Sequence, residues 1–473
     1  MAGAGGGSSK GVGAAGVDSL GDNHLSSRAH RRPGGQDGTV PEIPRRGLSR
    51  AARLAGLPAA HAARTAIGLG RRIGGRPAEI VAAEVQARGA EHLFAVLGEL
   101  KGGAMKVGQA MSAMEAALPV ELAAPYREAL VRLQEAAPPL PAATVNRVLA
   151  ESFGPSWRER FREFDDRPVA AASIGQVHRA VWNDGATVAV KVQYPGAANA
   201  LVSDLSHLDR LAPAIRFGAP NLDARKLFAE LRARLLEEVD YLREADAQRA
   251  FAHAFHEDED VFVPRVVEAR ERVLVSEWVD GTPLARVIDD GTVAERDRAG
   301  SVLVRLLASS PSRVGRVHGD PHPGNFRLLA DGRLAVLDFG SWEPAPAGWS
   351  PQLAELLRAG RDRDAHTLCA IAERTGLLKP GALSPAALLD FLDPMMEPLR
   401  TKTFTFTREW LQKQARQSSN PRSQYARAQR KLSVPARHLL LQRVAVGALA
   451  VLCSLGATVP VRAEAERWVP DFG

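Results

Sequence analysis

Two short segments of the chain carry residues suited to chemistry: HGDPHPGN, at 318–325, and Asp338-Phe339-Gly340. Asp320 can accept a proton from a hydroxyl group, and Asn325, five positions later, can point a carbonyl oxygen at a metal ion. Asp338 can add a carboxylate oxygen to the same metal. Magnesium prefers hard oxygen ligands and keeps waters, so two protein ligands plus phosphate oxygens suffice. The two segments together predict a magnesium-assisted phosphoryl-transfer site.

Other interpretations of the same segment are less specific. Asp320-Pro321 alone could be an ordinary turn, and His318 and His322 could be hydrogen-bonded loop histidines or zinc ligands. A zinc site needs a third ligand at suitable spacing, and the sequence shows none. Asp-Phe-Gly on its own would carry little information. Its spacing after an eight-residue segment of this composition makes the phosphoryl-transfer interpretation the stronger one.

The intervening stretch RLLADGRLAVLDFG predicts a hairpin that turns at Asp331-Gly332 and brings Asp338 back beside Asn325. Further upstream, Lys191 lies in VAVKVQYPG, the second strand of a hairpin signalled by Asn183-Asp184-Gly185. A lysine that faces inward from such a strand needs an anion, and a nucleotide phosphate would supply one. The alternative is an exposed lysine on an edge strand.

The first strand of this hairpin is predicted to pass through residues 170–176, AAASIGQ. Protein kinases carry a glycine-rich lid over the phosphates at this place, and three alanines would make the lid stiffer. A predicted helix that follows carries Glu238, Asp240 and Glu244. A solvated acidic face would also explain these three residues.

Charge is distributed unevenly along the 473 residues, whose net charge is +7. Residues 1–76 contain twelve Lys and Arg against four Asp and Glu, so the rest of the chain is close to neutral. The chain therefore lacks the overall footprint of a nucleic-acid-binding protein. The basic stretch at 48–72, which alternates Leu or Ile with Arg, predicts a helix with a solvated basic face or, alternatively, peripheral contact with an anionic membrane.

Cysteine content and hydropathy indicate in which cellular compartment the protein is expected. Only Cys369 and Cys453 are present, which argues against a disulfide framework and a cysteine zinc site. The first residues do not resemble a secretory leader, so we expect a cytoplasmic protein, peripheral at most at the inner face of the cell membrane. Residues 444–461 are uncharged, but a span needs about 20 apolar residues. A buried helix is favoured over a membrane span.

The motifs taken together resemble the UbiB/AarF family of atypical kinase-like proteins, which includes the ADCK proteins. The resemblance rests on six segments in this order: LKGGAMKVGQAMSAM, VAAASIGQVHRA, VAVKVQYPG, EEVDYLREA, HGDPHPGN and LDFG. It implies an α+β, two-lobed protein-kinase-like fold with a helical N-terminal extension over the active site. The expected divisions are a disordered tail at 1–45, the extension at 46–165, the N-lobe at 166–281 and the C-lobe at 282–473.

The resemblance also implies roles for individual residues. Asp320 would be the catalytic aspartate, and Asn325 and Asp338 would hold magnesium. Lys191 would contact the α- and β-phosphates and pair with Glu244. The expected nucleotide-binding set is Ala170, Ala171, Ala172, Ser173, Lys191, Glu244 and Glu277.

A regulatory element is implied in the same way. Lys106 and Gln109 would project from one helix face over the site, with Lys106 pairing Glu238 and Asp240 completing the acidic element. Together with the alanine lid, this helix would restrain phosphoryl transfer. Gly319 stands where many relatives have alanine, a departure that we expect to be neutral.

The resemblance implies an atypical kinase or ATPase that uses ATP (or ADP) and Mg²⁺. It would act near membranes in isoprenoid-quinone synthesis or lipid homeostasis, with a lipid or quinone intermediate as a further ligand. The absence of Ala-Pro-Glu after Gly340 argues against ordinary protein kinase activity. The alternatives are a small-molecule phosphotransferase of the aminoglycoside- or choline-kinase-like class and a non-enzymatic, nucleotide-dependent scaffold for biosynthetic enzymes.

Overall fold

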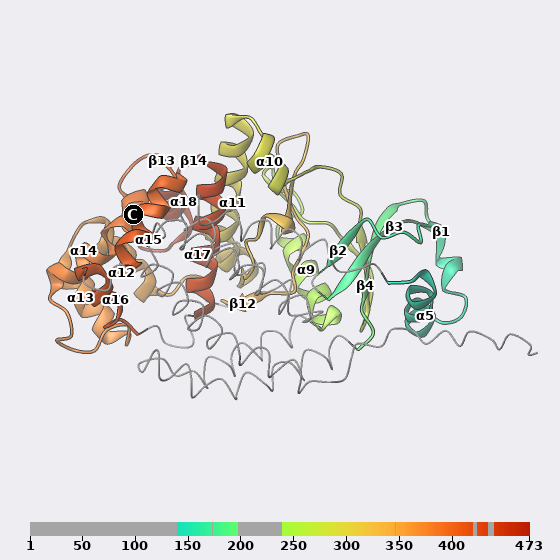
Figure 1. Cartoon of the computed structure of the whole chain (residues 1–473), viewed down its shortest axis with the longest axis horizontal. Coiled ribbons are helices and arrows are strands. Elements are labelled where there is room, and N and C mark those ends of the chain that lie inside the picture. The colour runs from blue at the N-terminus through green and yellow to red at the C-terminus, as the bar shows by residue number, and fades with distance from the viewer. Residues whose placement is uncertain (1–139, 173, 197–238, 346, 420–422, 434–438) are drawn as a thin grey trace, which may run out of the picture. The chain divides into compact units, whose positions relative to one another are not determined.

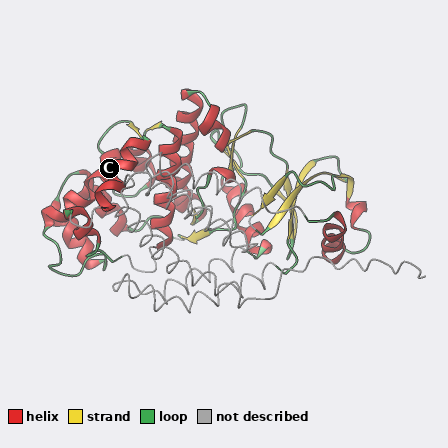
Figure 2. Cartoon of the chain, in the orientation of Figure 1, coloured by secondary structure: helices red, strands yellow, loops and turns green. Residues whose placement is uncertain are grey.

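The computed structural model describes residues 140–172, 174–196, 239–345, 347–419, 423–433 and 439–473. Figure 1 traces these residues in chain order, and Figure 2 colours them by secondary structure. Strands predominate in the first part of the described chain and helices in the second (Figure 2). This is the α+β composition predicted from the sequence. The predicted tail and most of the predicted extension lie outside the described residues.

An antiparallel sheet forms the first part, with strand order β1-β3-β4-β7-β6 and β2 paired to β3. Its elements are α5 (Ala142–Phe153), the 3-10 turn η1 (Trp157–Arg160), β1 (Phe161–Phe164), β2 (Ala170–Ala172), β3 (Gly175–Trp182), β4 (Thr187–Gln193), β6 (Val266–Arg270) and β7 (Val273–Glu277). Helix α9 (Tyr241–Ala254) lies between β4 and β6 in sequence and packs on β6 and β7. The predicted turn at Asn183-Asp184-Gly185 joins β3 to β4, and Gly185 takes the positive φ of 98° that the turn requires.

The sheet begins before residue 166, where the N-lobe was predicted to start. Strand β1 pairs with β3 in antiparallel register, and Trp157, Phe161 and Trp182 share one buried cluster with α5. The ring of Phe161 meets the ring of Trp182 edge-on at 4.9 Å. Residues 142–164 therefore belong to this sheet and its core, although they fall inside the predicted extension.

A buried histidine supports the first turn of the sheet. The side chain of His178 on β3 is fully buried and stacks on Phe164. Its Nδ1 lies 2.8 Å from the backbone oxygen of Asp165, and its Nε2 lies 2.8 Å from the side-chain nitrogen Nε2 of Gln176. A neutral ring that donates through Nδ1–H and accepts at Nε2 satisfies both contacts. Burial lowers the pKa of His178 below its usual value.

This burial makes stability depend on pH. As the pH falls through about 6.5, the unfolded chain takes up a proton at His178 that the folded protein does not bind, so folding is disfavoured. We expect the free energy of unfolding to fall more steeply between about pH 7.5 and 5.5 in the native protein than in His178→Gln. Urea denaturation at several pH values measures both slopes. Equal slopes would show that His178 does not stay neutral in the folded state.

The second part is mostly helical, as predicted. Its helices are α10 (Leu284–Asp290), α11 (Val293–Val314), α12 (Pro351–Arg361), α13 (Ala365–Arg374), α14 (Pro385–Met396), α15 (Arg408–Ser419), α16 (Gln424–Gln429), α17 (Leu439–Leu455) and α18 (Val461–Trp468), with 3-10 turns η3 (Pro323–Asn325) and η4 (Glu397–Leu399). Helix α11 begins at a capping box in which Thr292 and Glu295 satisfy each other's backbone N–H groups. It ends at Gly315, which takes a left-handed conformation.

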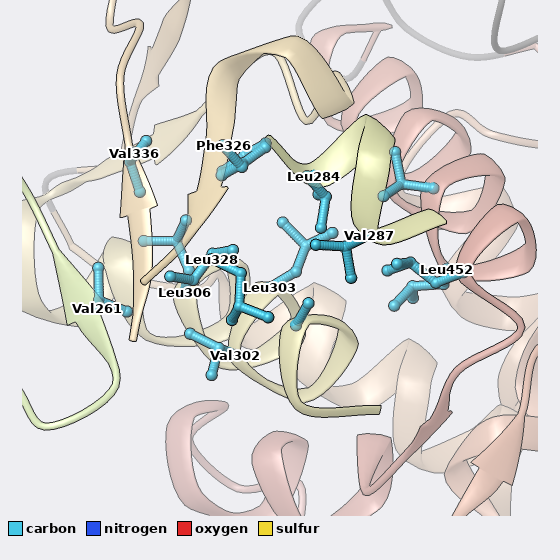
Figure 3. Close-up of a cluster of buried hydrophobic side chains, with 14 of the residues drawn as sticks. Val261, Leu284, Val287, Val302, Leu303, Leu306, Phe326, Leu328, Val336 and Leu452 are labelled. Atoms are coloured by element: carbon cyan, nitrogen blue, oxygen red, sulfur yellow. The ribbon is translucent and has the colours of Figure 1, made fainter. Parts of the chain in front are cut away.

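Short strands complete this part. They are β5 (Val261–Phe262), β8 (Thr282–Pro283), β9 (Arg316–His318), β10 (Phe326–Leu328), β11 (Leu334–Val336), β12 (Trp342–Pro344), β13 (Phe404–Thr405) and β14 (Thr458–Val459). The predicted hairpin is present, since β10 pairs with β11 around Gly332, whose φ is 84°. Beneath it, Phe326, Leu328 and Val336 pack with side chains of α10, α11 and α17 (Figure 3). This core fixes the segments that flank Asn325 and Asp338.

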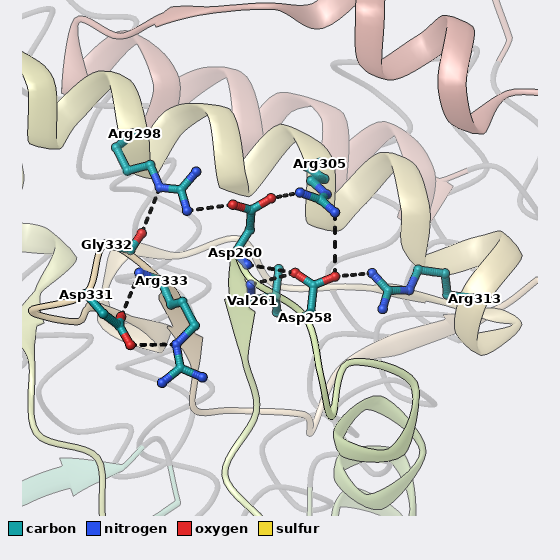
Figure 4. Close-up of polar contacts among 9 residues, drawn as sticks. All are labelled: Asp258, Asp260, Val261, Arg298, Arg305, Arg313, Asp331, Gly332 and Arg333. Atoms are coloured by element: carbon teal, nitrogen blue, oxygen red, sulfur yellow. Dashed lines mark hydrogen bonds and ion pairs between the residues drawn. The ribbon is translucent and has the colours of Figure 1, made fainter.

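An ion-pair network fixes the same hairpin from the side (Figure 4). Asp258, whose side chain is 4% exposed, pairs with Arg313, and Asp260 pairs with Arg298 and Arg305 of α11. Arg298 also donates from Nε to the backbone oxygen of Gly332 at 2.8 Å. Separating one partner from a buried group of ion pairs costs stability. These contacts therefore hold the hairpin turn against α11.

The uncharged run at 444–461 does not form one helix. Helix α17 ends at Leu455, Gly456 takes a φ of 64°, and the chain continues through β14 into α18. Val444, Val451 and Leu452 of α17 are buried. The prediction of a buried core helix therefore holds for residues 444–455, whereas residues 456–460 lie outside a helix. In the part of the chain that the structure describes, no helix is both long and apolar enough to cross a bilayer.

Candidate active site

Lys191 lies on β4, between β3 and β7, and joins two carboxylates. Its Nζ donates to Oε1 and Oε2 of Glu244 on α9 at 2.7 and 2.9 Å. A third, longer contact of 3.3 Å reaches Oδ2 of Asp338. The alternative of an exposed edge-strand lysine is wrong, because β4 is an interior strand and the Lys191 side chain is only 16% exposed.

Burial and neighbouring charges shift the pKa values of Lys191 and Glu244 in opposite directions. Burial alone would lower the pKa of Lys191, but Asp338 and Glu244 outweigh it and hold that pKa well above the usual value. Burial raises the pKa of Glu244, and Lys191 opposes that rise. One ammonium group thus faces two carboxylates. Carboxylate oxygens are also ligands that a hard cation such as magnesium prefers.

The loop with Asp320 and Asn325 lies against the segment that carries Asp338. Asn325 donates from Nδ2 to the backbone oxygen of Asp320 at 3.0 Å, and its own backbone oxygen accepts from Leu337 N at 2.9 Å. The buried ring of His318 places Nε2 2.7 Å from the backbone oxygen of Asp338. The structure therefore brings together Asp320, Asn325 and Asp338, as the hairpin argument predicted.

The Asp-Phe-Gly segment is held by its central residue. Phe339 is fully buried, with its ring 5.1 Å from Phe251 of α9 and 5.7 Å from His318. Gly340 N donates to Oδ1 of Asp338 at 2.9 Å. Both carboxylate oxygens of Asp338 thus have fixed directions, one toward the loop backbone and one toward Lys191. Asn325 and Asp338 supply amide and carboxylate oxygens, a donor set that fits magnesium.

The zinc alternative has no support in the described ranges. No three His, Cys, Asp or Glu side chains within 140–473, outside the gaps given above, are grouped so that they could hold a metal ion. His318 instead contacts the backbone of Asp338, and His322 accepts a hydrogen bond at Nδ1 from Gly324 N at 3.1 Å. These two histidines are part of the hydrogen bonding of the loop.

The alanine-rich segment forms a hairpin, not the single strand that was predicted. Strand β2 runs back along β3, with Ala170 opposite Val177 and Ala172 opposite Gly175. Position 175 needs glycine for its packing on β4, because a Cβ there would lie 2.3 Å from the backbone oxygen of Val192. Ser173 lies outside the described residues. Nucleotide contacts by Ala170, Ala171 and Ala172 stay a prediction.

The other predicted residues have different outcomes. Glu277 ends β7, and its carboxylate accepts from Arg265 N at 2.9 Å and Arg265 Nε at 2.6 Å, so its nucleotide role stays a prediction. Asp240 caps α9 by accepting from the N–H groups of Leu242 and Arg243. The regulatory residues Lys106, Gln109 and Glu238 lie outside the described residues.

Sequence reasoning missed Tyr241. Its side chain is fully buried, and its ring centre lies 5.0 Å from Lys191 Nζ. Burial raises its pKa, so the phenol stays protonated beside the ion pair. A tyrosine three positions before Glu244 on the same helix was the available signal, since residues at that spacing share a helix face.

Gly319 is not a neutral position, in contrast to the expectation. Its N–H donates to the backbone oxygen of Ser341 at 2.9 Å. A Cβ at this position would lie 2.6 Å from Ser341 Oγ and 2.9 Å from the Ser341 backbone oxygen. The glycine therefore allows the loop before Asp320 to lie directly against the segment after Asp338.

Gly319→Ala is expected to separate these two segments. The methyl group would push against backbone, which cannot move aside as a side chain end can, so overpacking of about 1–3 kcal/mol should result. We expect a lower urea midpoint, together with weaker nucleotide binding. The variant Gly319→Ala/Ser341→Gly removes the shortest contact, that with Ser341 Oγ, and should recover part of both losses. Unchanged stability in Gly319→Ala would show that the segments are further apart in solution.

Comparisons with known proteins agree with this geometry. The signature of the ABC1 atypical kinase-like domain matches residues 132–372. The solved structure of Rv3197 from Mycobacterium tuberculosis in complex with erythromycin is 43% identical, with a TM-score of 0.64. That match covers 84% of this chain and 99% of the Rv3197 chain.

Curated relatives are more distant. The mitochondrial atypical kinase coq-8 of Caenorhabditis elegans is 30% identical over 335 residues, which cover 69% of this chain and 43% of that protein. The mitochondrial atypical kinase COQ8 of Saccharomyces cerevisiae is 32% identical over 272 residues, covering 56% of this chain and 53% of that protein. The chain thus spans about half the length of these relatives. On the domain match and the Rv3197 structure, the chain belongs to the ABC1 atypical kinase-like family, the UbiB/AarF/ADCK proteins, and has their α+β protein-kinase-like fold.

Proposed function

We propose that the chain binds ATP with magnesium and transfers or hydrolyses its γ-phosphate. One observation carries the proposal: Lys191 joins Glu244 and Asp338 at 2.7–3.3 Å. In protein kinases a strand lysine paired with a helix glutamate contacts the phosphates, and the Asp-Phe-Gly aspartate binds the metal. The family match makes the same roles the natural assignment for these residues.

The contacts of Lys191 suggest how it would engage a phosphate. Its ammonium has three N–H groups, and two are held by the carboxylate of Glu244. The third makes the longest contact, 3.3 Å to Asp338. This N–H would turn to phosphate oxygens, while Glu244 keeps the side chain in place. The carboxylate of Asp338 would then ligate the metal.

The loop residues would complete the chemistry. Asp320 would accept the proton of the attacking hydroxyl group or water. Asn325 and Asp338 would hold magnesium, which neutralises developing charge on the phosphates when it is bound. The hydrogen bond from Asn325 Nδ2 to the Asp320 backbone leaves the carbonyl oxygen of the Asn325 side chain to face the metal. Preorganised charges of this kind are the main source of catalysis in phosphoryl transfer.

The acceptor defines the reaction class, and the resemblance favours water, a lipid or a quinone precursor over a protein. The test follows γ-³²P from ATP in the presence of membrane lipid extract. Label in inorganic phosphate supports an ATPase, and label in the organic phase supports a lipid kinase. Label on an added aminoglycoside or choline would favour the small-molecule phosphotransferase alternative. Nucleotide binding without any transfer would support the scaffold alternative.

Membrane association, which the family resemblance suggests, would be peripheral and electrostatic. Residues 1–76 contain twelve Lys and Arg against four Asp and Glu, a strong positive excess. We expect their deletion to weaken binding to phosphatidylserine vesicles, and salt of about 0.5 M to weaken binding of the full chain. Vesicle sedimentation measures both. Salt-resistant binding that only detergent reverses would contradict the electrostatic account.

The Rv3197 match favours a second candidate function, binding of a macrolide. The two chains are 43% identical over almost all of Rv3197, which was solved with erythromycin. A thermal-shift titration with erythromycin, in the presence and absence of ATP and Mg²⁺, tests this directly. A saturable rise in the midpoint supports macrolide binding, and no shift at millimolar erythromycin rejects it.

A further inference from the structure

Trp342, which follows the Asp-Phe-Gly segment by two residues, contacts two arginines. The guanidinium carbon of Arg243 on α9 is 4.2 Å from the centre of the Trp342 ring. The guanidinium carbon of Arg316 on β9 is also 4.2 Å from that ring. Arginine so close to an indole is held by cation–π attraction and stacking. One aromatic side chain therefore contacts two cations from separate segments.

Each arginine makes a further contact that extends this cluster. Arg316 pairs with Asp246 of α9 at 3.0 Å. Arg243 Nη1 lies 3.5 Å from the backbone oxygen of Gly340. Helix α9 is thus attached twice, through Arg243 and through Asp246, to β9 and β12. We call these four residues, Arg243, Asp246, Arg316 and Trp342, the tryptophan clamp.

The position of the clamp relates it to the candidate active site. Arg243 and Asp246 flank Glu244, the residue that holds Lys191. Trp342 follows Asp338 by four positions, and β12 pairs it with His318, two residues before Asp320. The clamp therefore joins the helix that carries Glu244 to both segments that carry the acidic residues. The Phe251–Phe339 contact joins the same parts from the core side.

We propose that Trp342 is a positioning residue, which holds α9 so that Glu244 stays on Lys191 while Asp338 keeps its place. This inference rests on the proposed nucleotide function, because it concerns the residues that would bind ATP and magnesium. Without the indole, Arg243 and Arg316 would both lose the ring on which they stack. Helix α9 would then be held less firmly to β9 and β12.

The indole N–H distinguishes the clamp from a hydrogen-bonded contact. Trp342 Nε1 is buried and has no hydrogen-bond partner among the described residues, and the same holds for Arg316 Nη1. The ring face, and not the N–H group, is therefore what the clamp uses. Phenylalanine keeps a face for both guanidinium groups and removes the unpaired donor. Trp342→Phe should hence preserve the clamp, whereas Trp342→Ala should open it.

Hydrogen exchange of the full chain without nucleotide, read by mass spectrometry, tests the clamp. In Trp342→Ala we expect peptides from α9 to exchange roughly tenfold faster than in the native protein, because two stacks are lost. Trp342→Phe should exchange at the native rate. Trp468→Ala is the matched control, since Trp468 is a half-buried tryptophan with Arg467 5.2 Å from its ring centre, on α18. It should leave exchange of α9 unchanged.

Two measurements, hydrogen exchange of α9 and ATP·Mg²⁺ affinity, test the clamp and the proposed function separately. ATP·Mg²⁺ affinity should fall roughly tenfold in Trp342→Ala and recover in Trp342→Phe. If the native protein binds no ATP, the proposed function fails, and exchange of α9 still decides the clamp. Native exchange of α9 in Trp342→Ala, or equally fast exchange in Trp468→Ala, overturns it. Should Trp342→Ala not fold, Arg243→Met removes one cation at similar length, and native α9 exchange in that variant also overturns the clamp.

Discussion

Asp338→Asn is expected to abolish magnesium-dependent nucleotide binding. The asparagine amide has nearly the shape of the carboxylate but no charge, so it would leave magnesium without its charged protein ligand. It would also place an amide near the ammonium of Lys191, which now lies 3.3 Å from Asp338 Oδ2. We expect ATP affinity in the presence of Mg²⁺ to fall by about a hundredfold or more. Isothermal titration with ATP, in Mg²⁺ and in EDTA, measures the loss.

Asp331→Asn is the matched control. Asp331 lies on the β10–β11 turn and pairs with Arg333, its carboxylate half exposed at 51%. The same chemical change there should leave ATP binding as in the native chain, because surface pairs contribute little. If Asp338→Asn binds ATP·Mg²⁺ as tightly as the control, Asp338 does not ligate the metal. If EDTA leaves native binding unchanged, the magnesium assignment is wrong altogether.

Glu244→Ala is expected to cause a large loss of stability. Glu244 is almost fully buried, and its removal takes from the Lys191 ammonium its two shortest hydrogen bonds and leaves the longer contact to Asp338. Breaking a buried ion pair in this way costs about 3–5 kcal/mol of unfolding free energy. Urea denaturation measures the loss, and nucleotide binding should fail in the same variant. A loss below about 1 kcal/mol would show that water reaches the pair in solution.

A double variant separates stability from nucleotide binding. Lys191→Met with Glu244→Leu replaces both charges by apolar side chains of similar size, which often restores or raises stability. We expect the double variant to be more stable than Glu244→Ala and still unable to bind ATP. The cycle of single and double variants should also be strongly non-additive, because the two residues are in contact. Nucleotide binding by a stable double variant would contradict the role of Lys191.

Sequence reasoning placed residues correctly where their positions depend on local structure. The turn at Asp331-Gly332 brings Asp338 back beside Asn325, and both turn signals and strand alternation are visible within fourteen residues. Lys191 lies on an interior strand, on the face of the sheet that meets Glu244 and Asp338. Its pairing with Glu244 spans 53 positions and came from the family resemblance, not from the spacing of the residues.

The features that were missed depend on contacts between distant segments. Trp342 on β12 contacts Arg243 on α9 and Arg316 on β9. Nothing in the local sequence indicates that these residues meet. The close approach of Gly319 to Ser341 is likewise a backbone contact that residue types do not reveal. Strand β1 was placed in the helical extension because four residues are too few for a period to be recognised.

The reversal at Ala172 was missed for a different reason. The segment AAASIGQ has no Asn-Gly or Asp-Gly signal and reads as one extended strand. In the structure Ala172 lies opposite Gly175, and the close approach of Gly175 to Val192 explains the glycine. Small residues here permit close packing of backbone on backbone, a role that hydropathy patterns cannot indicate.

One measurement tests the central claim, that Lys191 lies at the phosphates of bound ATP. An acyl phosphate of ATP delivers its acyl group to an amine beside the phosphates: the amine attacks the carbonyl, an amide forms and ATP leaves. Proximity makes this transfer far faster than reaction with distant lysines. Peptide mass spectrometry should find the amide on Lys191, suppressed by excess ATP with Mg²⁺ and absent in Asp338→Asn. Labelling of other lysines at equal yield, or labelling of Lys191 that ATP does not suppress, would contradict the account.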